Sequence, residues 1–186
     1  MSSSGTVGDD ERLRLFLGFR LPDAVGDAVA AWQRAELDVE RVRIVPLGNL
    51  HVTIAFLGSR PAGEVETVAS ALRGAVGDVA RPVLTPVRYR ETRSVGMLVL
   101  DDEEGRATRI AEGAHARLEK LGVYESEARN WLPHLTVVRF RERPRLEPSI
   151  PELGAVTMSD AAVYMSRLRP DGAQYEVLES VPLGGG

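Results

Sequence analysis

The chain has 186 residues, of which 44% are apolar and 27% charged, and its 23 basic and 27 acidic side chains give a formal net charge of −4. This length fits one compact domain, and the composition excludes a fibrous or largely disordered protein. The acidic balance argues against non-specific coating of nucleic acid, and the lack of cysteine excludes disulfides, thiolate zinc sites and thiol nucleophiles.

Hydrophobic periodicity predicts nine strands and three helices. The predicted strands span 13–20, 43–45, 51–57, 83–90, 95–101, 134–140, 155–158, 161–168 and 175–181. The predicted helices span 22–37, 61–76 and 106–121, and Gly122 ends the third. Neighbouring strands follow one another through short links, which cannot make parallel crossovers. We therefore expect an α+β fold with mostly antiparallel sheets.

The two ends of the chain are rich in small and polar residues. We expect residues 1–11 to be a disordered leader and residues 184–186 a frayed end, which leaves 12–183 as a single domain. No basic flank followed by an apolar stretch marks a targeting segment, and no apolar run approaches the roughly 20 residues of a membrane span. We expect a cytoplasmic monomer without membrane contacts.

Two of the three histidines open closely similar segments, with His-Val-Thr-Ile at 51–54 and His-Leu-Thr-Val at 134–137. In a strand, residues i and i+2 share a face, so each motif projects an imidazole and a hydroxyl together while its apolar residues face the core. The repeat predicts two similar lobes, related by a pseudo-two-fold axis, that place His51 with Thr53 and His134 with Thr136 across a cleft.

Two imidazoles that face each other suit the splitting of a phosphoester. In-line displacement needs a base for the incoming oxygen and an acid for the leaving one, and histidine can hold either form near neutral pH. Threonine hydroxyls can donate hydrogen bonds to the non-bridging oxygens. We therefore predict that His51 and His134 are catalytic, that Thr53 and Thr136 bind phosphate, and that the site uses neither metal nor cofactor.

The histidines have rival interpretations. A zinc site is a rival for the paired histidines, but the sequence offers no clear third ligand beside them. The third histidine, His115, lies within the helix predicted over 106–121 and has no threonine partner. We interpret His115 as a surface or packing residue.

The motifs and their flanks resemble the 2H phosphoesterases, and among them the bacterial and archaeal RNA 2′,3′-cyclic phosphodiesterases once called 2′-5′ RNA ligases. The resemblance covers nearly the whole chain from Arg14 and is carried by 14–22, 46–58, 133–139 and the closing hairpin at 165–183. It implies two α+β lobes with antiparallel sheets flanked by helices around a V-shaped central groove.

The same resemblance implies hydrolysis of a ribose 2′,3′-cyclic phosphate to a 2′-phosphate, by attack of water on phosphorus and expulsion of the 3′-oxygen. It assigns the general base to His134 and the general acid to His51. The two motifs are nearly symmetric, so the sequence itself does not order these roles.

Two further residues match positions that this family uses. Arg139 matches an arginine that approaches the phosphate, but strict alternation turns it away from His134, so it reaches the site only if the strand ends or bulges before it. Phe56 matches an aromatic position near the nucleobase, whereas alternation favours a core position. Ile44 stands where the family often has an aromatic residue, and Leu-Gly at 47–48 where it has Pro-Glu, so one wall of the groove differs.

The predicted substrate is RNA that ends in a 2′,3′-cyclic phosphate. Arginines at 88–93 and 139–145 are either solvated loop charge or a basic rim that leads an RNA end to the groove. The enzymatic alternatives are a small cyclic nucleotide as substrate, or the reverse reaction that joins RNA ends through a 2′,5′ bond. The alternative of another class is a nucleotide- or RNA-end-binding module without turnover, against which the two intact histidines argue.

Overall fold

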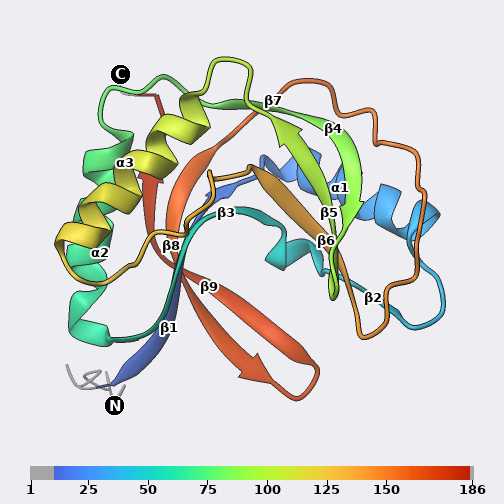
Figure 1. Cartoon of the computed structure of the whole chain (residues 1–186), viewed down its shortest axis with the longest axis horizontal. Helices are drawn as coiled ribbons and strands as arrows, with labels where there is room; N and C mark the ends of the chain where they lie inside the picture. The colour runs from blue at the N-terminus through green and yellow to red at the C-terminus, as the bar shows by residue number, and fades with distance from the viewer. Residues whose placement is uncertain (1–10, 185–186) are drawn as a thin grey trace, which may run out of the picture.

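The structure is a computed structural model that describes residues 11–184. Within this range nine strands form one curled antiparallel sheet, against which three α-helices pack (Figure 1). In chain order the elements are β1 (Arg12–Arg20), α1 (Asp23–Glu36), β2 (Val42–Ile44), β3 (His51–Pro61), α2 (Val65–Val76), β4 (Val83–Glu91), β5 (Val95–Asp101), α3 (Arg106–Lys120), β6 (His134–Phe140), β7 (Val156–Thr157), β8 (Asp160–Arg169) and β9 (Gly172–Pro182). The predicted α+β fold and its order of elements are confirmed.

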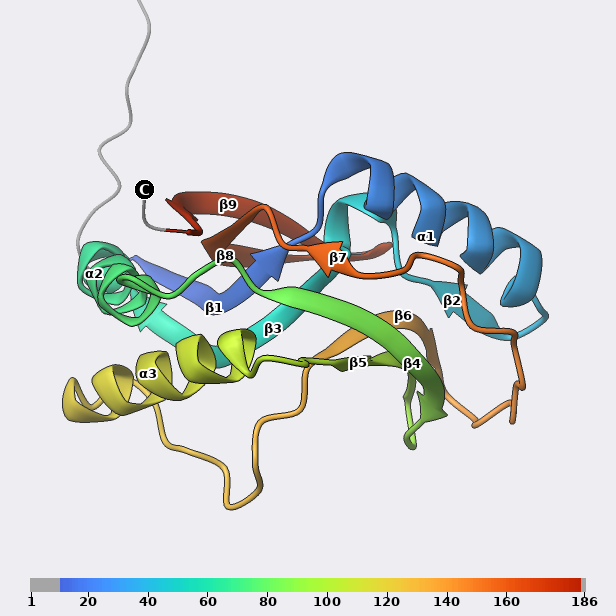
Figure 2. The same ribbon diagram turned by 90° about the horizontal axis from the view of Figure 1, so that it is seen from above.

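The sheet consists of two halves that meet in its middle. The strand order is β7-β4-β5-β6-β3-β1-β8-β9, with β2 added to β6. One half contains β3, β1, β8 and β9, and the helices α2 and α3 pack on it; the other contains β6, β5, β4, β7 and β2, beside which α1 lies (Figure 2). The two similar lobes that the repeated motif predicted are thus the halves of one continuous sheet.

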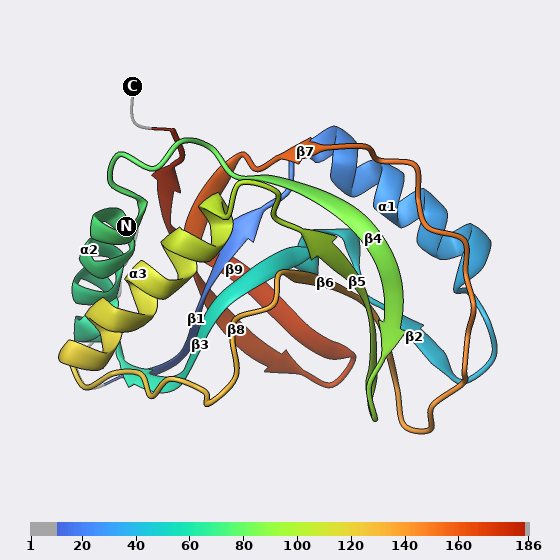
Figure 3. The same cartoon turned by 45° about the horizontal axis from the view of Figure 1, so that its top comes forward.

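The hairpin formed by β8 and β9 projects beyond the rest of the sheet (Figure 3). Two polar contacts tie its turn to the chain that leads into the first motif. The amide of Asn49 donates to the carbonyl of Ala173 at 2.7 Å, and the guanidinium of Arg43 donates to the carbonyl of Asp171 at 2.8 Å. The hairpin and the start of β3 are therefore held together.

The third helix ends at Gly122 as predicted, and an acidic side chain caps its first turn. The carboxylate of Asp102 accepts a hydrogen bond from the backbone N–H of Thr108 at 2.8 Å, so the acidic turn before α3 satisfies a free donor of its first turn. Gly122 follows the helix with a φ of 69°, a conformation that favours glycine. Between residues 11 and 184, no helix is both long and apolar enough to cross a membrane.

The start of the second helix differs from the prediction. The sequence predicted a helix from residue 61, but β3 continues through Pro61, a one-turn 3-10 helix covers Ala62–Glu64, and α2 begins at Val65. The reason is pairing with β1, which extends to Pro61, after which the N–H of Ala62 still donates to the carbonyl of Glu11 at 2.7 Å. Long-range pairing here prevails over local helix signals.

The predicted leader and frayed end fall largely outside the described residues. Residues 1–10 and 185–186 are not described, and Glu11 directly precedes β1. The predicted boundaries at 1–11, 12–183 and 184–186 stay predictions.

Candidate active site

The two motif strands, β3 and β6, meet at one residue pair. Val52 of β3 lies opposite Leu135 of β6, and both side chains are buried. Ile54 and Val137, two residues further along each strand, are buried as well. As predicted, the apolar residues of each motif face the core and anchor the strands from below.

This register brings the polar residues of the motifs together. In an antiparallel ladder, one step away from the pair in either direction places His51 across from Thr136 and His134 across from Thr53. Side chains opposite each other in such a pair lie roughly 5 Å apart at Cβ. The four residues therefore lie on one face, and a local two-fold axis relates the two histidines.

Each histidine is oriented by a backbone carbonyl two residues before it. Nδ1–H of His51 donates to the carbonyl of Asn49, and Nδ1–H of His134 donates to the carbonyl of Leu132, both at 2.8 Å. Because a carbonyl only accepts hydrogen bonds, it assigns the proton of the neutral ring to Nδ1 and leaves Nε2 with a lone pair that accepts. In His51 this lone pair accepts a hydrogen bond from the Thr53 hydroxyl at 2.9 Å. Both rings thus present Nε2 as the atom that can take up or release a proton.

The surroundings of the two histidines differ. The imidazole of His51 packs among three aromatic rings, with ring centroids at 4.8 Å for Phe16, 5.6 Å for Tyr164 and 5.4 Å for Tyr175. These rings come from β1, β8 and β9, which pairing in the first half of the sheet brings beside β3. His134 instead faces the cavity described below. The local two-fold symmetry of the motifs is broken by what packs around them.

Burial lowers the pKa of His51 from 6.5 to about 4. The hydrogen bond to the carbonyl of Asn49 raises this pKa, whereas the positive charges of His134 and Arg139 lower it. In the unliganded protein at neutral pH, His51 is therefore uncharged.

This pKa makes stability depend on pH with a definite sign. Between pH 6.5 and about 4 the unfolded chain binds a proton at His51 that the folded protein does not, so stability falls as the pH falls through this window. We expect His51 to account for a loss of about 2 to 3 kcal/mol in the free energy of unfolding between pH 7.5 and 4.5. Urea unfolding of the parent protein and of His51→Asn at both pH values measures this. An equal loss in both proteins would contradict the prediction.

A β-bulge three residues after each histidine determines which of the later residues in the strand lie on the same face as that histidine. The ladder between β1 and β3 skips Ile54, and the ladder between β5 and β6 skips Val137. A bulge adds one residue, so the alternation of faces is reversed beyond it. Phe56 and Arg139, each two residues past a bulge, therefore lie on the same face as the histidines.

The bulge in β3 overturns the prediction for Phe56, and the bulge in β6 meets the condition stated for Arg139. The core position favoured for Phe56 by alternation is wrong, because its side chain is 53% exposed and the guanidinium of Arg14 lies over its ring, 5.5 Å from the centroid. Arg139 is exposed, and the strand bulges before it as a site position required. That Arg139 binds phosphate stays a prediction.

A cavity of about 920 Å³ opens beside the motifs. Thr53, His134 and Phe56 line it, whereas His51 and Thr136 do not. The remaining wall includes two aromatic residues, three arginines and three glutamates: Tyr124, Trp131, Arg88, Arg90, Arg129, Glu112, Glu125 and Glu127. Across residues 11–184, no three histidine, aspartate or glutamate side chains are grouped so as to hold a metal ion.

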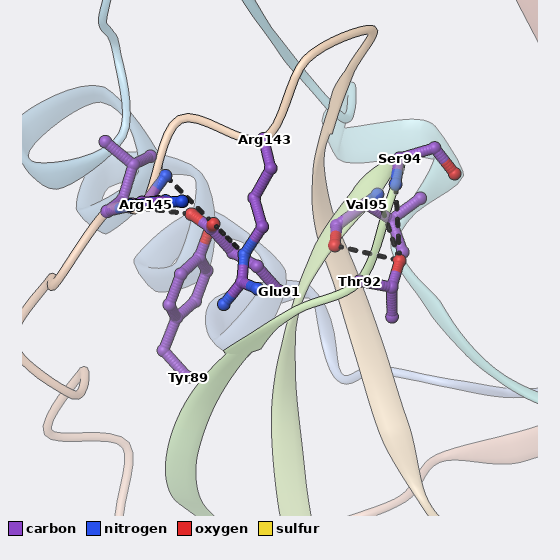
Figure 4. A network of polar contacts seen from close by, with 8 residues as sticks. Tyr89, Glu91, Thr92, Ser94, Val95, Arg143 and Arg145 are labelled. Carbon is purple, nitrogen blue, oxygen red and sulfur yellow. Dashed lines mark hydrogen bonds and ion pairs between the residues drawn. The ribbon is translucent and has the colours of Figure 1, made fainter.

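A buried carboxylate holds the chain after β6 against β4 (Figure 4). The side chain of Glu91 is 2% exposed and accepts hydrogen bonds from Nε of Arg143 at 3.1 Å and from the hydroxyl of Tyr89 at 3.2 Å. The backbone N–H groups of Arg145 and Leu146 also donate to it, at 3.0 and 2.8 Å. Of the predicted basic rim, Arg143 therefore belongs to a structural ion pair.

Several site features have little or no signal in the sequence. The carbonyls of Asn49 and Leu132 orient the histidines, but they are backbone groups that any residue supplies. The indole N–H of Trp131 donates to the carbonyl of Thr53 at 3.0 Å, which holds the loop before β6 against the first motif. Its position three residues before His134 was the available hint.

Known proteins resemble this chain in sequence and in fold. The family described as LigT like Phosphoesterase matches residues 19–82. The RNA 2′,3′-cyclic phosphodiesterase of Thermus thermophilus is 29% identical over 183 residues, which cover 93% of this chain and 91% of the relative. The protein of the same name from Methanocaldococcus jannaschii is 22% identical over 180 residues, which cover 90% of this chain and 99% of the relative.

Solved structures agree with the sequence relatives. TT0787 of Thermus thermophilus has a TM-score of 0.74 at 28% identity, with 93% of this chain and 99% of that chain covered. LigT of Escherichia coli, complexed with 3′-AMP, has a TM-score of 0.77 at 20% identity, with 94% and 100% covered. In fold and in sequence the chain is similar to LigT-like phosphoesterases. The relatives that match most of its length are named RNA 2′,3′-cyclic phosphodiesterases.

Proposed function

We propose that this protein hydrolyses the 2′,3′-cyclic phosphate at the end of an RNA to a 2′-phosphate. The observation that carries the proposal is the register of β3 and β6, which sets two imidazoles and two hydroxyls on one face around a local two-fold axis. The curated relatives that match most of the chain are named RNA 2′,3′-cyclic phosphodiesterases, which supports the same substrate class.

In the proposed mechanism, one imidazole takes a proton from water through Nε2 while the water oxygen attacks phosphorus. The bond from phosphorus to the 3′-oxygen breaks, and Nε2 of the other imidazole gives its proton to that oxygen. Thr53 and Thr136 donate hydrogen bonds to the two non-bridging oxygens, where negative charge develops. Family resemblance makes His134 the base and His51 the acid.

The assignment of His51 as the acid requires that it gain a proton when substrate binds. Its pKa of about 4 keeps it neutral in the unliganded protein. A phosphate monoanion beside Nε2 favours the charged imidazolium and so raises this pKa. Substrate binding thereby favours protonation of His51. The rings of Phe16 and Tyr164 exclude water from the imidazolium that forms.

The cavity beside the motifs favours an RNA end over a small cyclic nucleotide. Its volume of about 920 Å³ exceeds what a single cyclic phosphate fills, and its lining includes aromatic rings and three arginines beside three glutamates. Arginine can neutralise backbone phosphates, and aromatic rings can stack on bases. The nucleotides that precede the cyclic phosphate are the part of an RNA that fits this description.

The decisive experiment incubates the purified protein with an RNA oligonucleotide that ends in a 2′,3′-cyclic phosphate. We expect a 2′-phosphate product, equal rates with and without EDTA, and a lower KM for the oligonucleotide than for the cyclic mononucleotide. A 3′-phosphate product would reverse the assigned leaving oxygen. Loss of activity on chelation, restored by a divalent metal, would support the zinc interpretation, and binding without turnover would support the binding module.

The role of Arg139 is tested against a matched arginine elsewhere. Loss of a charge-assisted hydrogen bond to phosphate weakens binding, so we expect Arg139→Ala to raise KM by about tenfold or more. Arg117 on α3, whose guanidinium donates to the carbonyl of Gly113 at 3.1 Å, serves as the control. Equal steady-state kinetics of Arg139→Ala and Arg117→Ala would remove Arg139 from the site.

A further inference from the structure

The carbonyl group of each bulge residue is held by a side chain from a helix. Nε2–H of His115, on α3, donates to the carbonyl of Ile54 at 2.8 Å. The side-chain amide of Gln33, on α1, donates to the carbonyl of Val137 at 2.7 Å. The two helices belong to different halves of the sheet, yet they contact equivalent residues, each three positions after a motif histidine.

The two bulge carbonyls differ in their backbone partners: the ladder with β1 leaves the carbonyl of Ile54 unpaired, whereas the carbonyl of Val137 also accepts the backbone N–H of Val45 at 3.0 Å. Because β1 passes over Ile54 without pairing, the imidazole of His115 supplies the donor that a regular strand would have supplied. The ring of His115 is itself fixed, since it stacks on Tyr124 with centroids 4.8 Å apart and an angle of 26° between the planes. This donor therefore has a defined position.

The contact that Gln33 makes in the other half of the sheet has an energetic cost. Gln33 is fully buried, and its side-chain oxygen has no hydrogen-bond partner among the described residues. An unpaired buried polar atom is unfavourable, so the benefit of an amide here lies in its N–H donors. Those donors bind the carbonyl of Val137 and, at 3.1 Å, that of Val45, which joins the end of β2 to the bulge.

We propose that His115 and Gln33 are positioning residues that keep the two bulges formed, and so hold Phe56 and Arg139 on the catalytic face. This proposal rests on the function proposed above. Loss of the side-chain donor weakens each bulge, and we expect the strand to shift toward strict alternation, which turns the residue two positions past the bulge toward the core. His115 controls Phe56, and Gln33 controls Arg139.

The absence of cysteine provides a readout that needs no catalysis. A single thiol placed at position 56 or 139 is the only one in the chain, so its rate of modification by a disulfide reagent reports which face the residue occupies. In Phe56→Cys we expect fast modification, slowed by about tenfold or more when His115→Phe is added, because a thiol turned into the core is protected. His115→Phe keeps an aromatic ring beside Tyr124 but removes the donor.

Three matched variants separate positioning from general damage. His115→Gln supplies an amide donor, as Gln33 does in the other half, and we expect it to restore fast modification of the thiol in Phe56→Cys. His115→Phe should leave the modification rate of Arg139→Cys unchanged, and Gln33→Met should slow the thiol at position 139 but not the thiol at position 56. His115→Leu replaces His115→Phe if the larger ring does not fit.

The kinetic arm links the bulge to the reaction. At a temperature where all variants are folded, we expect His115→Phe to lower kcat/KM by about 10- to 100-fold, because a small displacement of binding groups has effects of that size, and His115→Gln to recover most of it. Unchanged thiol reactivity in folded His115→Phe would overturn the proposal whatever the substrate. Altered thiol reactivity without activity in the parent protein would instead reject the proposed function.

Discussion

Replacing either His51 or His134 by alanine is expected to lower the rate of cyclic phosphate hydrolysis by about 100- to 10,000-fold, the usual contribution of one general acid or base. Each imidazole presents Nε2 because Nδ1–H is bound to a backbone carbonyl. Removal of one ring leaves either the attacking water without its base or the leaving oxygen without its acid. Steady-state rates on a cyclic-phosphate oligonucleotide measure the loss.

Asparagine substitutions test whether the loss of activity comes from the loss of Nε2. Asparagine can keep the donor to the preceding carbonyl but has nothing at the position of Nε2, so His51→Asn and His134→Asn should be as slow as the alanine variants. Because the two groups act in one transition state, the double alanine variant should lose far less than the product of the single losses.

The folded state should survive these substitutions. Both rings lie on the polar face of strands whose buried anchors, Val52 and Leu135, are untouched. Urea unfolding at neutral pH, where His51 is uncharged, should confirm folded variants. A single variant that keeps activity within about threefold of the parent would falsify the two-histidine mechanism, since a true acid or base contributes at least about 100-fold.

Glu91→Ala is expected to lower the free energy of unfolding by about 3 to 5 kcal/mol, the usual effect of breaking a buried ion pair. The carboxylate is 2% exposed and satisfies Arg143, the hydroxyl of Tyr89 and two backbone N–H groups at once. Its removal leaves these donors without an acceptor. Thermal unfolding should show a midpoint lower by roughly 10 °C for a chain of this size.

Two other variants serve as comparisons for this loss of stability. Glu91→Gln keeps one acceptor oxygen and should lose less than Glu91→Ala. Glu142, which is exposed in the segment that Glu91 secures, is the matched control, and Glu142→Ala should change the free energy of unfolding by no more than about 0.5 kcal/mol. Similar midpoints for Glu91→Ala and Glu142→Ala would show that the segment is held by its other contacts.

The elements of the fold could be predicted because they follow local patterns. The alternation around His51 and His134 is visible in four residues of sequence, and it indicates both the strands and the faces that they bury. The turn residues before α3 and Gly122 after it mark helix ends for equally local reasons. The pairing partners of each strand are not local, which is why β3 proved longer than predicted.

The site beyond the four motif residues could not be predicted, because it depends on single skipped residues. Alternation carried past Ile54 places Phe56 in the core, and only the pairing of β1 with β3 reveals the bulge. Glu91 and Gln33 look like ordinary polar residues until distant backbone groups are brought to them. His115, interpreted as a surface or packing residue, is half-buried and binds a bulge carbonyl.

The single pair of Val52 and Leu135 that joins the halves of the sheet also bears on the direction of the reaction. A two-fold axis through this pair exchanges the two histidines. The four motif residues alone would therefore bind a phosphodiester equally well in either of two opposite orientations. Orientation must come from groups that the axis does not repeat, such as the aromatic rings around His51 and the cavity beside His134. Under the proposed mechanism, the walls of the site and not the four motif residues therefore determine which way round the substrate binds.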